Sequence, residues 1–287
     1  MAKYVLSAFA DEVTPVFDKQ LEYLKKQNIK YIEPRNIDGT NVSSLTLSQA
    51  KDVKKKLDSY GIGVSSVGSP IGKIHFEDDF DEHLKLLENT IDIAEIFETK
   101  NIRMFSFYCP RESDPHEFRE KVFPWLEKLL EVAEKRNVNL CHENEKAIYG
   151  EAPEDCLEIM EHFGGRMKSV LDMGNFAFCQ KNPMLGYELL HPYIEYIHIK
   201  DSYYDANIVP PGQGDGQIPE ILAKFDKYTD KKVFLTLEPH LTVFSGLEKL
   251  SNLDDLKGQN KFATPDEAFD VATSELRKIL ANIGQIV

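Results

Sequence analysis

Short runs rich in β-branched and aromatic residues alternate with longer amphipathic stretches along the whole 287-residue sequence, and this alternation most limits the possible folds. Repeated strand–helix units form parallel sheets that are covered by their helices. We count eight strand candidates, at about Tyr4–Ala8, Tyr31–Pro34, Gly63–Val67, Ile102–Phe107, Val138–Glu143, Ser169–Asp172, Tyr196–Lys200 and Val233–Glu238. A closed α/β barrel typically needs about 250 residues, so we expect the α/β class and a single (β/α)8 barrel over residues 1–287.

Recognisable helix starts lie between the strand candidates. The pair Thr14-Pro15 supplies a cap and a first-turn proline, and Thr46 with Gln49 forms a capping box. The run Thr-Pro-Asp-Glu at 264–267 starts the closing helix in the same way. Apolar side chains at helical spacing predict two buried helix faces, formed by Leu84, Leu87, Ile91 and Ala94, and by Trp125, Leu129 and Val132.

Charge and cysteine content narrow the function classes. Lys and Arg total 34 against 48 Asp and Glu, and the net charge of −14 would repel nucleic acid and anionic lipid. The four cysteines are scattered without a CxxC pair, which fits a reducing compartment. The N-terminus lacks an export signal, and the sequence contains no run of about 18 apolar residues. We therefore expect a cytoplasmic protein with no nucleic-acid partner and no membrane span.

Four ionisable residues, Glu143, Asp172, His198 and Glu238, each lie near the C-terminal end of a strand candidate. Strand ends of a parallel barrel share one rim, so these side chains should converge. Three carboxylates and one imidazole are a ligand set for a divalent cation, with Mn²⁺ or Mg²⁺ favoured and Co²⁺ or Zn²⁺ admitted. Taken singly, each carboxylate could be a solvated or paired rim charge, and His198 a hydrogen-bonded structural histidine.

The segments around these residues resemble the metal-dependent sugar isomerase/epimerase superfamily, the xylose-isomerase-like TIM barrels that include ketose 3-epimerases, hydroxypyruvate isomerase and inosose dehydratase. The resemblance covers nearly the whole chain. It implies that Glu143, Asp172, His198 and Glu238 bind one divalent metal, with Mn²⁺ the first choice. The motifs that carry it are CHENE at 141–145, VLDMGN at 170–175, YIHIKD at 196–201, PGQGDG at 211–216 and TLEP at 236–239.

The resemblance also implies that Glu143 and Glu238 are the catalytic acid and base. A hydroxyketone or hydroxyaldehyde that chelates the cation has an acidic C–H next to its carbonyl, and loss of that proton gives an enediolate. One glutamate can remove the proton and the other can return it. We therefore expect an isomerase or epimerase that acts on a small sugar or sugar derivative.

Several further residues are candidates for substrate binding. Lys200 and His240 share strand parity with His198 and Glu238, and Asn175 and Lys73 follow other strand candidates, so these four side chains could reach substrate oxygens. Arg35 and Arg111 could likewise meet a carboxylate or phosphate, although scattered cations are often merely solvated. The run Gly212–Gly216 lacks the Gly-Lys-Ser/Thr ending of a phosphate loop, so we interpret it as a rim loop.

Other functions remain open at this point. A metal-dependent dehydratase of a keto-sugar or inosose would use the same cation and base, and a non-catalytic sugar-binding barrel could retain the ligands. An endonuclease IV-like DNA-repair enzyme needs more histidines than this rim supplies, and the negative charge opposes DNA binding. The resemblance suggests a homodimer or homotetramer, and the long connection 240–263 would cover the rim or join an interface.

Overall fold

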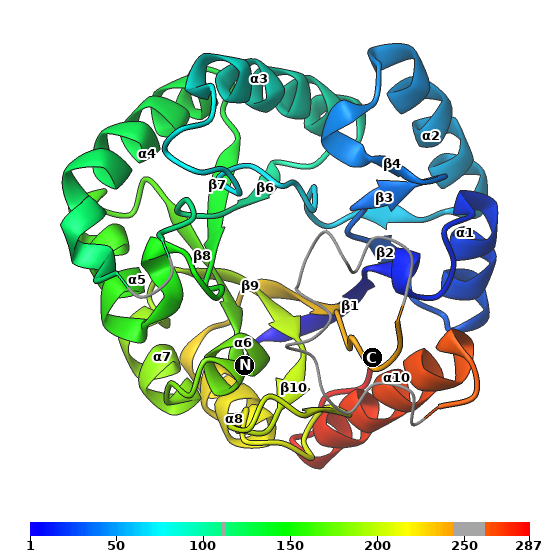
Figure 1. The fold of residues 1–287 in the computed structure, drawn as a ribbon. Coiled ribbons are helices and arrows are strands. Elements are labelled where there is room, and N and C mark those ends of the chain that lie inside the picture. The colour runs from blue at the N-terminus through cyan, green and yellow to red at the C-terminus, as the bar shows by residue number, and fades with distance from the viewer. Residues whose placement is uncertain (111–112, 244–261) are drawn as a thin grey trace.

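A ring of helices surrounds a ring of parallel strands in the computed structural model, which describes residues 1–110, 113–243 and 262–287 (Figure 1). Six strands form one parallel sheet in the order β1-β12-β9-β8-β7-β6. Their bounds are Lys3–Ala8 for β1, Asn101–Met104 for β6, Asn139–Glu143 for β7, Lys168–Asp172 for β8, Ile194–Ile199 for β9 and Lys232–Leu237 for β12.

Two shorter strands complete the ring between β1 and β6. β2 (Tyr31–Ile32) pairs in parallel with β5 (Gly63–Val64). Two further contacts join this pair to the main sheet. The Glu33 N–H, directly after β2, donates to the Ala8 carbonyl of β1 at 3.1 Å, and Val67, after β5, forms a parallel bridge with Ile102 of β6. Within the described residues, each of the eight strand candidates therefore coincides with a barrel strand, and the predicted (β/α)8 barrel is confirmed.

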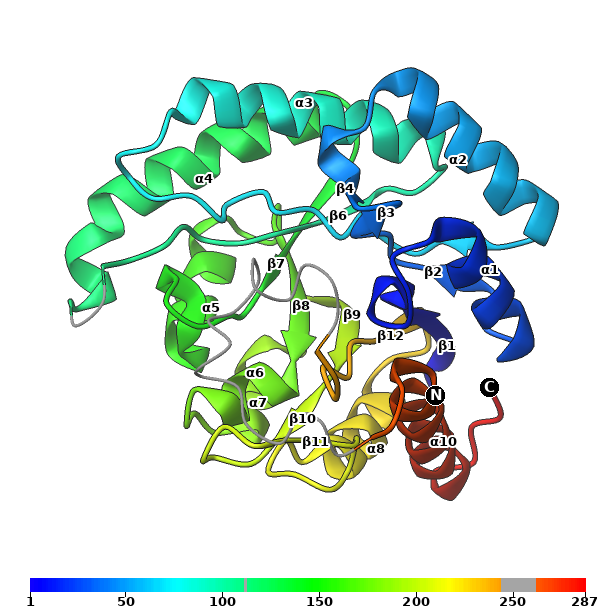
Figure 2. The same ribbon diagram turned by 45° about the vertical axis from the view of Figure 1, so that its right-hand side comes forward.

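Helices follow the strands in chain order and cover the outside of the barrel (Figures 1 and 2). Two antiparallel hairpins, β3–β4 (Asn36–Ile37 and Thr40–Asn41) and β10–β11 (Asp201–Ser202 and Ile208–Val209), lie in the segments that follow β2 and β9. The helices are α1 Phe17–Lys26, α2 Leu47–Tyr60, α3 Phe80–Ile96, α4 Arg119–Glu134, α5 Pro153–His162, α6 Met173–Phe178, α7 Pro183–Leu190, α8 Ile218–Tyr228 and α10 Pro265–Asn282. Short 3-10 turns span Ala10–Glu12, Val42–Ser44, Pro115–Phe118 and Tyr149–Glu151.

Two of the three predicted helix starts are confirmed. Thr46 and Gln49 form the expected capping box of α2, and the Thr264 hydroxyl accepts the Glu267 N–H at the start of α10. In the described ranges, no helix has both the length and the apolar character that a membrane crossing needs.

The predicted start of the first helix at Thr14-Pro15 is wrong, because α1 begins at Phe17. The Thr14 hydroxyl accepts only the Val16 N–H, at 3.3 Å, whereas the Phe17 N–H donates to Asp38 Oδ1 at 2.8 Å. The β3–β4 connection, 21 residues further along the chain, therefore supplies the cap. A contact between distant segments has no local sequence signal.

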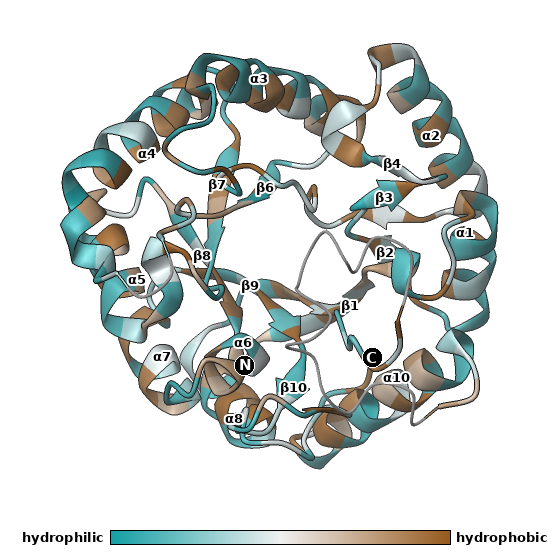
Figure 3. Ribbon diagram, viewed as in Figure 1, coloured by the Kyte–Doolittle hydropathy of each residue, from teal (hydrophilic) through white to brown (hydrophobic). Residues whose placement is uncertain are grey.

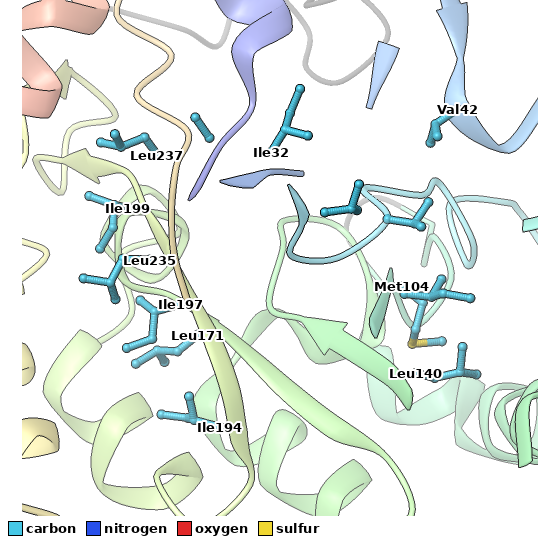
Figure 4. Close-up of a cluster of buried hydrophobic side chains, with 14 of the residues drawn as sticks. Ile32, Val42, Met104, Leu140, Leu171, Ile194, Ile197, Ile199, Leu235 and Leu237 are labelled. Atoms are coloured by element: carbon cyan, nitrogen blue, oxygen red, sulfur yellow. The ribbon is translucent and has the colours of Figure 1, made fainter. Parts of the chain in front are cut away.

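Apolar side chains fill the layer between strands and helices. Ile197, Ile199, Leu235 and Leu237 on β9 and β12 lie on one side of their strands and are fully buried (Figure 4). The helices carry apolar residues on the sides that face the barrel (Figure 3). Buried side chains of the two predicted helix faces join this layer, namely Leu87, Ile91, Ala94 and Leu129.

The barrel interior changes character along the strands. Cys141, Val170 and Tyr196 form a small buried cluster inside the strands, with Phe234 packed against it. Because side chains alternate along a strand, the inward residues two positions further on are Glu143, Asp172 and His198. Buried apolar side chains therefore fill the interior in the middle of the strands, and ionisable side chains line it at the C-terminal ends of the strands.

Candidate metal and substrate site

The four residues predicted as metal ligands meet at the C-terminal end of the barrel. Glu143 and Asp172 are the last residues of β7 and β8, His198 is in β9, and Glu238 directly follows β12. One donor atom from each lies within 4.8 Å of the others, and all four side chains are buried. The order β12-β9-β8-β7 places these strands side by side, so parallel register and alternation are enough to gather the four donors.

His198 lies at the centre of this cluster. Its Nδ1 is 2.9 Å from Glu143 Oε1 and 3.2 Å from Glu238 Oε2. Asp172 Oδ1 accepts the Asn175 N–H at 2.8 Å, and Asp172 Oδ2 lies 3.4 Å from Lys200 Nζ. Three carboxylates and an imidazole thus point at one small volume.

The donor set fits a divalent cation. Among the described residues, Asp172 Oδ2 and Glu238 Oε2 are buried and accept no hydrogen bond, although each has a cationic or imidazole neighbour. Buried carboxylate oxygens without donors are costly, and a bound cation removes that cost. Burial raises the pKa of Asp172 to about 7 because the attraction of Lys200 does not offset it. A bound cation would hold Asp172 in its charged form.

An arginine contacts the second oxygen of each glutamate. Arg103 Nη1 lies 3.3 Å from Glu143 Oε2, and Arg35 Nη1 donates to Glu238 Oε1 at 2.8 Å. Both guanidinium groups lie over the ring of Phe9, at 4.9 Å and 4.5 Å from its centroid. The two glutamates are therefore held in fixed orientations by groups beneath the rim.

Neighbouring cationic groups keep both glutamates ionised. Burial acts to raise the pKa of Glu143, but His198 and Arg103 together lower it to about 2. Burial opposes ionisation of Glu238 as well, and Lys200 and His198 outweigh it, so that its pKa lies well below the usual range. Permanently charged carboxylates are good metal ligands but weak bases, so any proton that they remove must already be acidified.

A pocket opens above the cluster, and all four predicted substrate-binding residues line it. Lys73 pairs with Glu145 at 3.2 Å, and the Asn175 side chain donates to the Asn144 carbonyl at 2.9 Å. The described lining residues are Lys73, Arg103, Glu145, Lys146, Asn175, Phe178, Lys200, Ile208, Glu238 and His240. Arg111, the other cation considered for substrate binding, lies outside the described residues, as does most of the connection 240–263.

His240 belongs to a second small group with Glu12 and Glu238. Its Nε2 lies 3.3 Å from an oxygen of each carboxylate, and burial together with the repulsion of Lys200 lowers the pKa of His240 to about 4. Arg35 Nη2 lies 3.6 Å from the same Glu12 oxygen. Since the guanidinium of Arg35 already contacts Glu12 in this group, we do not assign a second metal ion to the group.

Sequence reasoning missed part of this site. Arg103 sits in the apolar run Asn101–Phe105, where an inward-facing charge was a signal that it needs a buried partner. Arg35 was considered as a ligand for a substrate anion, but it is 2% exposed and its guanidinium is shared by Asp11 and Glu238. Glu33, which contacts His198, carried no motif that distinguished it.

The glycine-rich run wraps a buried carboxylate on the rim. Asp201 accepts backbone N–H groups from Gly212, Gly214 and Gly216 at 2.7, 2.9 and 3.0 Å. A Cβ added at Gly214 would collide with Asp201 Oδ1. The run is therefore a rim loop, as the sequence predicted, and it fixes the segment that carries Ile208 into the pocket.

Replacing Asp201 by alanine should strongly destabilise this loop. Three backbone donors would lose their acceptor. A buried unsatisfied donor such as the Gly216 N–H costs about 1–3 kcal/mol, and the part-buried N–H groups of Gly212 and Gly214 add less because water reaches them. We expect the free energy of unfolding to fall by about 3 kcal/mol, measured by denaturant titration. An unchanged stability would show that water replaces Asp201 at no cost; Asp230→Ala, at an exposed position outside this loop, is the control.

Comparisons with known proteins agree with the barrel. The sequence model of the family described as xylose isomerase-like TIM barrel matches residues 21–251. A search of curated protein sequences gives no significant match.

Solved structures share the fold at low sequence identity. An IolI protein with a bound zinc atom aligns with a TM-score of 0.74 and 16% identity, covering 99% of both chains. The probable 3-DHS dehydratase AsbF from Bacillus anthracis gives 0.71 and 17%, covering 98% of this chain and 99% of its own. The 3-keto-D-glucoside 4-epimerase YcjR from E. coli gives 0.68 and 12%, covering 98% and 100%. At these identities the likeness establishes the architecture.

Proposed function

Because this chain belongs to the xylose isomerase-like TIM barrel family, we propose that it is a divalent-metal-dependent isomerase or epimerase of a sugar or sugar derivative. The observation that carries the proposal is the arrangement of Glu143 and Glu238. Each contributes one oxygen to the same donor cluster and has its other oxygen held by an arginine. A protein that only binds sugar has no evident need for two such carboxylates.

The chemistry follows from these positions. When bound, the cation supplies polarisation of a substrate carbonyl, which makes the neighbouring C–H acidic. One of Glu143 and Glu238 removes that proton and leaves an enediolate, whose negative charge Lys200 and Arg103 stabilise from the pocket wall. The other glutamate is ionised at rest, so it first takes a proton from a substrate hydroxyl group or from water and then delivers it to carbon. Return to the opposite face of the same carbon completes an epimerisation. Return to the adjacent carbon, together with transfer of the hydroxyl proton from one substrate oxygen to the other, completes an isomerisation.

The residues of the pocket suggest how a sugar is held. Asn175, Lys200, His240 and Lys73 provide donors at the mouth of the barrel, and we assign them to substrate oxygens. Mn²⁺ is our first choice of cation because the donor set is rich in oxygen and has one imidazole, with Mg²⁺, Co²⁺ and Zn²⁺ as alternatives. We place the reaction in the cytoplasm, in a homodimer or homotetramer, with no nucleic-acid or membrane partner.

A dehydratase is the second candidate, and the position of Lys200 favours it. Loss of a hydroxyl group next to the enediolate needs an acid beside the leaving oxygen, and the Lys200 ammonium lines the pocket. The fold is shared with a protein described as a probable 3-DHS dehydratase. The two candidates differ in product, because only the dehydratase releases water.

Proton exchange tests the proposed function before the substrate is known. The metal-loaded protein is incubated in D₂O with a panel of free, phosphorylated and acidic sugars and with each of the four cations. We expect deuterium at the carbon beside the carbonyl of at least one sugar, read by NMR. If the product carries deuterium but has lost no atoms of the sugar, the result supports an isomerase or epimerase. If the product has lost one water molecule, the result supports the dehydratase. No incorporation across the panel would favour a binding protein.

A further inference from the structure

A buried carboxylate outside the donor cluster contacts the imidazole of His198 on the side of the ring opposite to Glu143 and Glu238. Glu33 directly follows β2 and is fully buried, and its Oε2 lies 3.2 Å from His198 Nε2. His198 Nδ1 faces Glu143 and Glu238. Both ring nitrogens of one histidine are thus in contact with carboxylates, one within the donor cluster and one beneath it.

On the basis of the proposed metal-dependent function, we propose that Glu33 is the positioning residue of the site. Its carboxylate accepts a hydrogen bond from the Nε2–H group of His198, which keeps the proton on Nε2 and directs the Nδ1 lone pair at the cation. A neutral imidazole carries its one proton on either nitrogen, and only the nitrogen without the proton can bind a metal. The carboxylate at Nε2 selects the tautomer that the cluster requires and increases the basicity of Nδ1.

Glu33 is itself held in place. Its Oε1 accepts the Tyr196 hydroxyl at 2.9 Å, and that hydroxyl also lies 3.0 Å from Ser66 Oγ. The Glu33 N–H donates to the Ala8 carbonyl, which joins the segment after β2 to β1. The rings of Phe9 and Tyr196 pack against His198 at centroid distances of 5.1 and 5.4 Å. The imidazole therefore has little freedom to rotate, and Glu33 is the carboxylate at its Nε2 side.

A purely electrostatic role is the alternative. Glu33 carries a negative charge near the barrel axis, and any such charge attracts a cation and offsets Arg103. Glu145 provides the matched comparison, because it is also a carboxylate at the barrel mouth and is half-buried. It pairs with Lys73 and is not part of the donor cluster. Removal of its charge should change the field without changing the orientation of His198.

The test measures metal affinity and not turnover. Mn²⁺ binding is followed by electron paramagnetic resonance for the wild type, Glu33→Gln, Glu33→Ala, Tyr196→Phe and Glu145→Gln, after circular dichroism has shown that each variant is folded. Loss of a group that orients a metal ligand typically weakens binding about 10- to 100-fold. We expect losses near the lower end for Glu33→Gln, near the upper end for Glu33→Ala, and smaller losses for Tyr196→Phe and Glu145→Gln.

A second readout reports the tautomer itself. In the Zn²⁺-loaded protein, histidine ¹⁵N NMR should give a protonated Nε2 for His198 in the wild type, and a mixture of tautomers or a shifted signal in Glu33→Ala. Equal affinity in the wild type and both Glu33 variants would overturn the inference and leave the proposed function standing, as would an equal loss in Glu145→Gln. A wild-type protein that binds none of the divalent cations would instead overturn the proposed function.

Discussion

Replacing Glu238 by glutamine should lower kcat by about 10²- to 10⁴-fold, the range typical for loss of a positioned acid or base. The amide keeps the size of the side chain and one ligand oxygen, but it cannot accept a proton. The same change at Glu143 should have an effect of similar size, because each glutamate performs one of the two transfers. The measurement is kcat at saturating metal, with the sugar that the deuterium-exchange panel identifies.

The control for this pair lies on the protein surface. Glu95 on α3 pairs with Arg136 outside the barrel, and Glu95→Gln makes the same chemical change far from the donor cluster. We expect its kcat to stay within twofold of the wild type, as is usual for surface substitutions. Near-normal rates for either Glu143→Gln or Glu238→Gln at saturating metal would remove that residue from the proton transfer.

Removing the divalent cation should abolish turnover and lower the melting temperature. The two glutamates are weak bases with lowered pKa values, so they need a substrate proton that the cation has made acidic. Without the cation, one oxygen from each of three buried carboxylates lies within 4.8 Å of the others, and the repulsion between these groups destabilises the folded state. Saturation at 100 times Kd stabilises a protein by about 2.7 kcal/mol, which raises the melting temperature of a chain of this size by about 4–5 °C.

Differential scanning fluorimetry with and without a chelator measures this shift, and readdition of Mn²⁺ should reverse it. Asp172→Asn supplies the specificity control, because it removes the charge of one ligand from the cluster. Its melting temperature should respond much less to added metal than that of the wild type. A metal-dependent shift of the same size in Asp172→Asn would place the stabilising cation elsewhere on the protein.

Much of the fold could be predicted from the sequence because each barrel strand has a local sequence signal. Each parallel strand is an apolar run with turn signals at its ends, and the helices between them carry their own caps, as at Thr46 and Thr264. The start of α1 could not be predicted in this way. Its first N–H donates to Asp38, which lies 21 residues further along the chain in the β3–β4 connection.

The candidate site also contains residues that have a local sequence signal and residues that are recognised only by their contacts with distant parts of the chain. Glu143, Asp172, His198 and Glu238 could be found because each lies at or next to the C-terminal end of a strand, and these strand ends meet at one rim of the barrel. Arg103 and Glu33 could not, since their importance lies in which buried group they contact across the barrel. Residue types alone do not specify such pairs, whose members are 40 and 165 positions apart.

The most direct test of the central claim is a crystal structure of the Mn²⁺-loaded protein with an anomalous difference map recorded at the manganese edge. We expect one strong peak per chain inside the cluster, with carboxylate oxygens of Glu143, Asp172 and Glu238 and Nδ1 of His198 at about 2.0–2.3 Å, the range of metal–ligand bonds for such donors. A peak that lies elsewhere, or none at the four strand ends, would contradict it.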